Sequence, residues 1–134
     1  MEILGPDHLA QIGDLFAGVF TAETWNDDWS DRKQLDLFLL DLTGQSNSLT
    51  YGLYEDGELI GVSMGHIKHW YGGTEYCVEE FCIKTDRQGR GIGTVGLERI
   101  FLQTEKTVPA YGFYRKNGFC ELQDHVSFVK ELPR

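Results

Sequence analysis

The sequence predicts an α+β domain, of the α/β kind, in which a mixed, mostly antiparallel sheet is flanked by helices. Three observations support this prediction. Apolar residues recur at helical spacing in two segments near the start, three strand-like segments separated by turn residues follow, and further strands and a helix complete the chain. Elements in this order bury their apolar faces by packing helices against a sheet.

The first two elements are predicted to be amphipathic helices. Residues 8–20 place their apolar side chains on one helical face, and Asp7 is positioned to cap this helix. A second helix is predicted to begin after Ser30 or Asp31, since either side chain can serve as its cap, and to end at Leu42.

The middle of the chain is predicted to form three consecutive strands, over residues 49–54, 58–70 and 76–83. Asp56 and Gly57 separate the first two strands, and an Asp-Gly pair is typical of a tight hairpin turn. Antiparallel pairing of these strands follows from the short connections between them.

The last third is predicted to contain a short helix that reaches only Glu98, a strand over residues 99–104 and a helix opened by Val108 and Pro109. Asn117 and Gly118 are a natural end for that last helix. Two closing strands are predicted over residues 119–122 and 126–131.

Composition limits the function. The chain carries 21 acidic and 12 basic residues, a net charge of −9, which argues against nucleic acid as a partner. An acidic cleft would instead concentrate a cationic substrate. No apolar stretch approaches the roughly 20 residues that cross a bilayer, so no membrane partner is expected.

The three cysteines, Cys77, Cys82 and Cys120, lack the spacing of metal ligands, so no metal cofactor is expected. Free thiols of this kind and the absence of signal-peptide features at the start indicate a cytoplasmic protein.

A glycine-rich run follows the third predicted strand. Glycine lets backbone N–H groups approach a ligand closely, and N–H groups at the start of a helix favour a phosphate. The run consists of Gln88, Gly89, Arg90, Gly91, Ile92, Gly93 and Thr94.

Two motifs together resemble the GCN5-related N-acetyltransferase (GNAT) superfamily. The first is Gln88-x-x-Gly91-x-Gly93 after a strand, and the second is the segment from Tyr111 to Phe119, Tyr-Gly-Phe-Tyr-Arg-Lys-Asn-Gly-Phe. The resemblance covers essentially the whole chain and implies one N-acetyltransferase domain over residues 1–134.

The resemblance implies that the cosubstrate is acetyl-CoA. Its pyrophosphate would bind the run from Gln88 to Thr94, and its pantetheine arm would lie along a strand that splays from its neighbour, at Phe81, Cys82 and Ile83. Tyr114 matches the tyrosine that lies near the thioester sulfur in many members and protonates the departing thiolate.

The attacking nucleophile would be the amine of the acceptor, which must first lose a proton, commonly to a carboxylate. Glu79 and Glu80 are the candidates, and neighbouring residues of a regular strand point to opposite faces, unless a bulge changes the alternation. We favour Glu80 and keep Glu79 as the alternate. His66 and His69 are further candidates on the preceding strand.

The sequence departs from the family pattern after the glycine run. Members usually have a helix of three or four turns there, whereas Gly93 to Glu98 allows barely two. The helix is therefore expected to be shortened, either natively or because residues are missing from the sequence. Thr107 and Val108 stand where members often carry an asparagine, which leaves one cofactor contact open.

The acceptor is expected to be a small cationic amine. Trp25, Asp27, Asp28 and Trp29 form a loop that combines aromatic faces with carboxylates, which suits a cation, and Glu79 and Glu80 add to that charge. The chain resembles bacterial aminoglycoside 6'-N-acetyltransferase-like members of the superfamily. Polyamines and peptide or lysine amines are the alternatives, as is a non-catalytic acyl-CoA-binding regulatory module. A homodimer is left open.

Overall fold

The computed structural model describes residues 1–23, 25–87 and 99–133. The glycine-rich run and the short helix predicted after it lie outside these residues. The chain forms two compact units, Met1–Gln103 and Thr104–Arg134.

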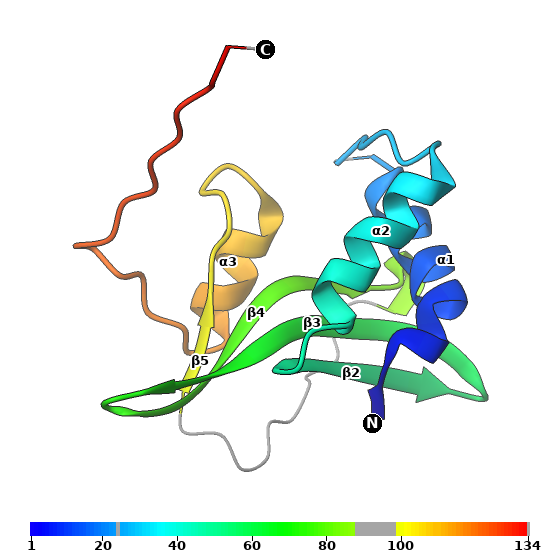
Figure 1. Ribbon diagram of the computed structural model, residues 1–134, viewed down its shortest axis with the longest axis horizontal. Helices are drawn as coiled ribbons and strands as arrows, with labels where there is room; N and C mark the ends of the chain where they lie inside the picture. The colour runs from blue at the N-terminus through cyan, green and yellow to red at the C-terminus, as the bar shows by residue number, and fades with distance from the viewer. Residues whose placement is uncertain (24, 88–98, 134) are drawn as a thin grey trace. The chain divides into compact units, whose positions relative to one another are not determined.

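The first unit is built on a five-stranded sheet whose strands follow in chain order (Figure 1). The first four strands pair antiparallel, and the last pair is parallel, so the predicted mixed, mostly antiparallel sheet is confirmed. The strands are β1 (Glu2–Leu4), β2 (Ser48–Glu55), β3 (Glu58–Trp70), β4 (Gly73–Ile83) and β5 (Arg99–Leu102).

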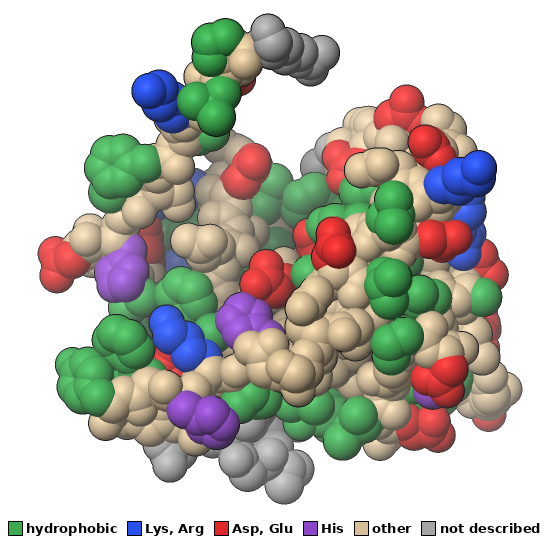
Figure 2. Space-filling view, in the orientation of Figure 1, with side chains coloured by type: hydrophobic (Ala, Val, Ile, Leu, Met, Phe, Trp, Pro, Cys, Tyr) green, Lys and Arg blue, Asp and Glu red, His purple; other side chains and the backbone are tan. Residues whose placement is uncertain are grey.

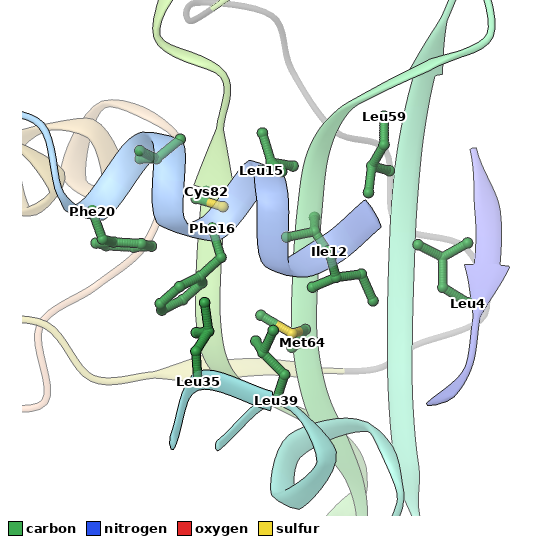
Figure 3. Packing of buried hydrophobic residues seen from close by; sticks show 12 residues of the cluster. Leu4, Ile12, Leu15, Phe16, Phe20, Leu35, Leu39, Leu59, Met64 and Cys82 are labelled. Carbon is green, nitrogen blue, oxygen red and sulfur yellow. The ribbon is translucent and has the colours of Figure 1, made fainter. Parts of the chain in front are cut away.

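Two helices, α1 (Leu9–Phe20) and α2 (Arg32–Thr43), lie over one face of the sheet (Figure 1). Their apolar faces pack on side chains of β2, β3 and β4, and Met64 and Cys82 point from the sheet toward these helices (Figure 3). This burial is the main stabilising contribution to the unit. The core residues are Leu4, Ile12, Leu15, Phe16, Val19, Phe20, Leu35, Leu39, Leu59, Val62, Met64 and Cys82.

The two helices begin differently from each other. Asp31 caps α2, since its carboxylate accepts hydrogen bonds from the backbone N–H groups of Lys33 and Gln34 at 3.0 and 3.3 Å. The predicted cap of α1 by Asp7 is wrong. Asp7 belongs to a 3-10 turn, η1 (Pro6–His8), and His8 takes the capping position without a side-chain hydrogen bond.

The turn between β2 and β3 has the geometry that its sequence predicts. Asp56 and Gly57 both adopt positive φ, at 51° and 78°. Two consecutive left-handed residues match the right-handed twist of the flanking strands, which explains the Asp-Gly pair. A second 3-10 turn, η2 (Thr85–Arg87), follows β4.

The second unit contains α3 (Pro109–Lys116), which ends as predicted at Asn117 and Gly118, where Gly118 has φ of 85°. Glu121 ties the following segment to this helix, because its carboxylate accepts the Tyr111 hydroxyl hydrogen at 3.0 Å and pairs with Lys106 at 2.8 Å.

The two closing strands predicted over residues 119–122 and 126–131 are not formed in this structure. Their apolar side chains are largely exposed, with Phe128 at 94% and Val129 at 91%. Alternating apolar residues favour a strand only when a neighbouring strand supplies hydrogen-bond partners, and the described residues provide no such pairing here.

Candidate active site

The central feature of the site is a β-bulge in β4. Glu80 lies opposite Met64 of β3, whereas the next pair in the ladder joins Gly65 to Val78. Glu79 is therefore an extra residue between two register pairs, and a bulge of this kind makes two residues oppose one. The bulge changes the direction of the strand at the position of the two candidate bases.

The bulge places both carboxylates on the side of the sheet that carries the helices. Met64, the partner of Glu80, points into the helix-covered core (Figure 3). His66 lies two residues further along β3 and therefore on the same face, and its Nδ1 lies 3.2 Å from Oε1 of Glu79. The strict alternation expected for Glu79 and Glu80 does not hold here, because the extra residue interrupts it.

Glu80 is half-buried, and its surroundings disfavour its charged form. Removal from water is the largest cause, followed by repulsion from Asp27 and from Glu79, and together they raise the pKa of Glu80 to about 7. Such a carboxylate is a candidate proton acceptor near neutral pH. Burial, with a contribution from the charge of Glu80, raises the pKa of the neighbouring Cys82 to about 12, so this thiol stays protonated.

Asp27 reaches the site from the loop between α1 and α2. Its backbone N–H donates to the carbonyl of Phe20 at 2.9 Å, and the preceding Asn26 has a positive φ of 53°, so the chain turns sharply after α1. Asp27 is the loop residue whose charge acts on Glu80. The structure thus places Asp27 and Glu79 close enough to Glu80 for their charges to act on it.

The other predicted loop residues have local structural contacts. Trp29 stacks on Phe38 with ring centroids 5.2 Å apart and meets Phe16 edge-on at 5.6 Å, so it anchors the loop to the core. Asp28 accepts a hydrogen bond from the backbone N–H of Ser30 at 3.1 Å, and hydrogen bonding from Ser30 lowers its pKa.

Trp25 differs from Trp29 in its exposure. Its ring meets Phe20 edge-on with centroids 5.3 Å apart, while 38% of the residue stays accessible. It is therefore the tryptophan of this loop that can present an aromatic surface to a ligand.

The pairing of β4 with β5 ends before the residues that the resemblance assigns to the pantetheine arm. The parallel ladder with β5 joins Glu75–Val78 to Arg99–Leu102 and stops immediately before the bulge, while β4 continues to Ile83. Cys82 and Ile83 are buried, and Phe81 is half-buried opposite Ser63. The predicted pyrophosphate-binding residues, from Gln88 to Thr94, lie outside the described residues.

Tyr114 belongs to the second unit. It lies in α3, where its ring makes edge contacts with Phe113 and Phe119, with centroids 5.4 and 5.3 Å apart. These contacts fix the ring within the unit and explain why the segment from Tyr111 to Phe119 is rich in aromatic residues.

Figure 2 shows acidic side chains and a histidine near the middle of the displayed face. The contact between His66 and Glu79 makes these two residues a close pair. Sequence reasoning named His66 only as a candidate base and did not foresee this pair. The position of His66 two residues after Met64 places it on the same face as Glu80, but this can be inferred only when the register of β3 and β4 is known.

A separate cavity of about 660 Å³ lies between α1, the turn after β2 and the segment after β4. Gln11, Asp14, Lys84 and Asp86 are among its lining residues, and none of the predicted site residues that the structure describes lines it. In the described part of the chain, no group of three or more His, Cys, Asp or Glu is arranged to hold a metal ion. No helix there is long and apolar enough to cross a membrane.

The mixed sheet with its helices agrees with the family comparison. A family model described as Acetyltransferase (GNAT) family matches residues 9–119, and the chain belongs to this family. It is therefore an acetyl-CoA-dependent N-acetyltransferase, since the family uses acetyl-CoA as its acetyl donor. A search of curated protein sequences gives no significant match.

Solved structures share the fold at low identity. An aminoglycoside acetyltransferase from an uncultured soil metagenomic sample, in complex with sisomicin, has a TM-score of 0.68 at 22% identity, covering 98% of this chain and 95% of its own. A ribosomal-protein-alanine N-acetyltransferase from Brucella melitensis biovar Abortus 2308 has 0.69 at 16%, with coverages of 98% and 97%.

A third solved structure, AAC(6')-Iy with the bisubstrate analogue CoA-S-monomethyl-acetylneamine, has a TM-score of 0.71 at 13% identity, with coverages of 98% and 97%. At these identities the likeness establishes the fold and leaves the acceptor to be argued from the residues of this chain.

Proposed function

We propose that this acetyltransferase acetylates a primary amine of a small cationic acceptor, with an aminoglycoside as the favoured class. The observation that carries the proposal is the acidic group formed by Asp27, Glu79 and Glu80. Burial, followed by repulsion from Asp27 and from Glu79, raises the pKa of Glu80 to about 7. A protonated amine placed among them would relieve that repulsion, so the site favours a cation.

Glu80 is proposed as the general base. Above a pH of about 7 its carboxylate is ionised and can take a proton from the acceptor ammonium, directly or through one water. Loss of that proton leaves a lone pair on the amine nitrogen, which is then free to attack a carbonyl carbon. Glu79 is the alternate base, and it is more exposed and is paired with His66.

Tyr114 is proposed as the general acid, whose phenol gives a proton to the departing sulfur. The support is its position in the segment from Tyr111 to Phe119, which resembles the segment of the family that carries such a tyrosine. Acetyl-CoA, when bound, supplies the acetyl group as an activated thioester. Backbone groups of Phe81, Cys82 and Ile83 would hold its pantetheine arm. The glycine-rich run would hold its pyrophosphate.

The second part of the proposal concerns the acceptor. Trp25 is exposed and lies in the same loop as Asp27, so this loop supplies both an aromatic surface and a carboxylate. The net charge of −9 attracts a polycation at long range. A similar fold binds sisomicin in the soil metagenomic enzyme. Polyamines and peptide or lysine amines remain the competing acceptors.

Both units of the chain are proposed to act as one N-acetyltransferase domain.

The acceptor is tested by thiol release from acetyl-CoA with kanamycin, spermidine and a lysine peptide as separate acceptors. We expect the highest kcat/KM with kanamycin. Faster turnover of spermidine or the peptide would reassign the acceptor class. Binding of CoA without turnover of any amine would favour the regulatory module over an enzyme.

The base and acid are tested by single substitutions in the same assay. Glu80→Gln should lower kcat by about 10²- to 10⁴-fold, whereas Glu75→Gln, a matched change on the same strand, should leave it nearly unchanged. Tyr114→Phe should slow turnover with little effect on CoA binding, and Tyr111→Phe is its control on the same helix. An unchanged rate for Glu80→Gln or Tyr114→Phe would remove that residue from the mechanism.

A further inference from the structure

The pair formed by His66 and Glu79 is not used by the mechanism above, although it adjoins the base. Nδ1 of His66 lies 3.2 Å from Oε1 of Glu79, and the side chains retain 33% and 50% of their accessible surface. Both are therefore partly shielded from water, and their interaction is screened less than that of a fully exposed pair.

The bulge couples this pair to Glu80. Glu79 and Glu80 together oppose Met64, so their carboxylates share one side of the sheet instead of being separated by it. The charge of Glu79 is one of the causes that disfavour ionisation of Glu80. Any group that offsets the charge of Glu79 must therefore make Glu80 easier to ionise.

We propose that His66 is a positioning residue that acts through Glu79 to set the pH range in which Glu80 works as the base. A protonated His66 offsets the Glu79 carboxylate and lets Glu80 ionise at a lower pH than it otherwise would. Histidine suits this role because it is the side chain that ordinarily changes charge near neutral pH. The inference rests on the proposed role of Glu80.

The other groups near Glu80 do not offset the negative charge of Glu79. From the loop between α1 and α2, Asp27 adds repulsion, and on β4 the Cys82 thiol stays protonated. Met64 on β3 is apolar, and the side chains packed from α1 and α2 are also apolar. Lys68 lies two residues beyond His66 on β3, with its ammonium over the ring of Trp70, 4.7 Å from the centroid. Its charge acts on Cys77 and is not among the causes that act on Glu80. Among the described residues, His66 is the group of positive charge that is paired with Glu79.

The first test follows the carboxyl carbon of Glu80 by ¹³C NMR as a function of pH, with Glu80→Gln identifying the signal. Its titration does not depend on turnover. His66→Ala should move the Glu80 midpoint to higher pH by about 0.3–0.7 units. Glu79→Gln should move it to lower pH. An unmoved midpoint in His66→Ala would overturn the inference.

A double variant tests whether His66 acts through Glu79. In the Glu79→Gln background, His66→Ala should move the Glu80 midpoint by less than in the parent, because His66 no longer has the carboxylate that favours its charged form. An equal shift in both backgrounds would overturn the inference. His69→Ala is the matched control, since His69 lies on the same strand with its ring near Thr74, 3.3 Å from the Thr74 hydroxyl, and it should not move the midpoint.

The pH profile of kcat/KM then separates this inference from the proposed function. The acid limb should shift with the Glu80 midpoint in each variant. If the midpoint moves as expected and the acid limb does not follow, the coupling stands and Glu80 is not the base. The variant His66→Asn keeps a hydrogen-bond donor near Glu79 without the charge, and it should shift the midpoint like His66→Ala.

Discussion

Met64 and Glu80 face each other across β3 and β4, while their neighbours Gly65 and Val78 form the next pair. The one-residue excess on β4 explains how two adjacent glutamates come to lie on the same side of the sheet. A buried methionine on the partner strand also explains why Glu80 is partly removed from water. The position of this bulge therefore determines the electrostatics of the site.

Replacement of Glu80 should stabilise the fold at high pH. The pKa of Glu80 is raised from 4.5 to about 7, so the folded protein binds this proton more tightly than the unfolded chain does. Its burial is therefore without penalty below a pH of about 4.5 and destabilises the fold increasingly as the pH rises to about 7. The advantage of Glu80→Gln over the parent should grow by about 2 kcal/mol across this interval, after allowance for partial exposure.

Urea unfolding at pH 4.5 and pH 8 measures this difference, with Glu75→Gln as a control for the loss of a carboxylate from β4. If the advantage of Glu80→Gln is the same at both pH values, the burial of Glu80 has been overstated.

Gly65 should tolerate no larger residue. An added Cβ would lie 2.2 Å from the carbonyl oxygen of Cys77 and 2.9 Å from the ring of Tyr76, and a backbone oxygen cannot move away cheaply. Gly65→Ala should destabilise the fold by about 3 kcal/mol or more. Gly18→Ala is the matched control, because nothing lies within 4 Å of its added Cβ, and in a helix it should stabilise by about 0.5–1 kcal/mol. Thermal unfolding of both variants checks the contrast, and similar melting temperatures would contradict it.

Loss of the cap on α2 should weaken the helix that completes the core. Asp31→Ala removes the acceptor for two backbone N–H groups and should lower the free energy of unfolding by about 1 kcal/mol. Asp31→Asn keeps a side-chain oxygen in place and should retain most of the stability. Denaturant titration of the two variants distinguishes capping from a general effect of charge, which would affect both equally.

The hydroxyl of Tyr76 should contribute to stability in a way that the hydroxyl of Tyr54 does not. Tyr76 is buried, its hydroxyl contacts Ser63 Oγ at 2.9 Å and donates to the Leu49 carbonyl at 3.1 Å, and burial raises its pKa to about 12. Tyr76→Phe leaves these partners unsatisfied and should cost about 1–2 kcal/mol. Tyr54→Phe removes an exposed hydrogen bond to Gln11 and should cost about 0.5 kcal/mol or less. Equal losses in equilibrium unfolding would refute the distinction.

Local signals explain which parts of the fold could be predicted. The helices α1 and α2 have continuous apolar faces, so their bounds were predicted nearly to the residue. The turn at Asp56 and Gly57 was predicted because it requires residues that adopt positive φ. Strand β1 was missed because three residues carry no periodic signal, and it exists only through its pairing with β2. The closing strands were predicted from alternation alone and are not formed in this structure.

The site could be predicted only in part, because part of it depends on pairing between strands and not on local sequence signals. Asp27, Glu79 and Glu80 were named from their charge and positions, and the structure places the first two close enough to Glu80 for their charges to act on it. The bulge depends on the register between two strands, which periodicity within one strand does not reveal. Trp29 was predicted from the sequence to contact the acceptor, and in the structure it stacks on Phe38 and anchors the loop.

The contacts of Tyr76 have a consequence for how firmly the site is aligned. Its side chain extends from β4 past Ser63 of β3 to the backbone of Leu49 on β2, so one hydroxyl links three strands. If β4 slid along β3 by two residues, this link would break and His66 would no longer meet Glu79. The phenol of Tyr76, on the face away from the helices, thus stabilises the register of β4 against β3. That register in turn keeps the acidic groups aligned on the opposite face.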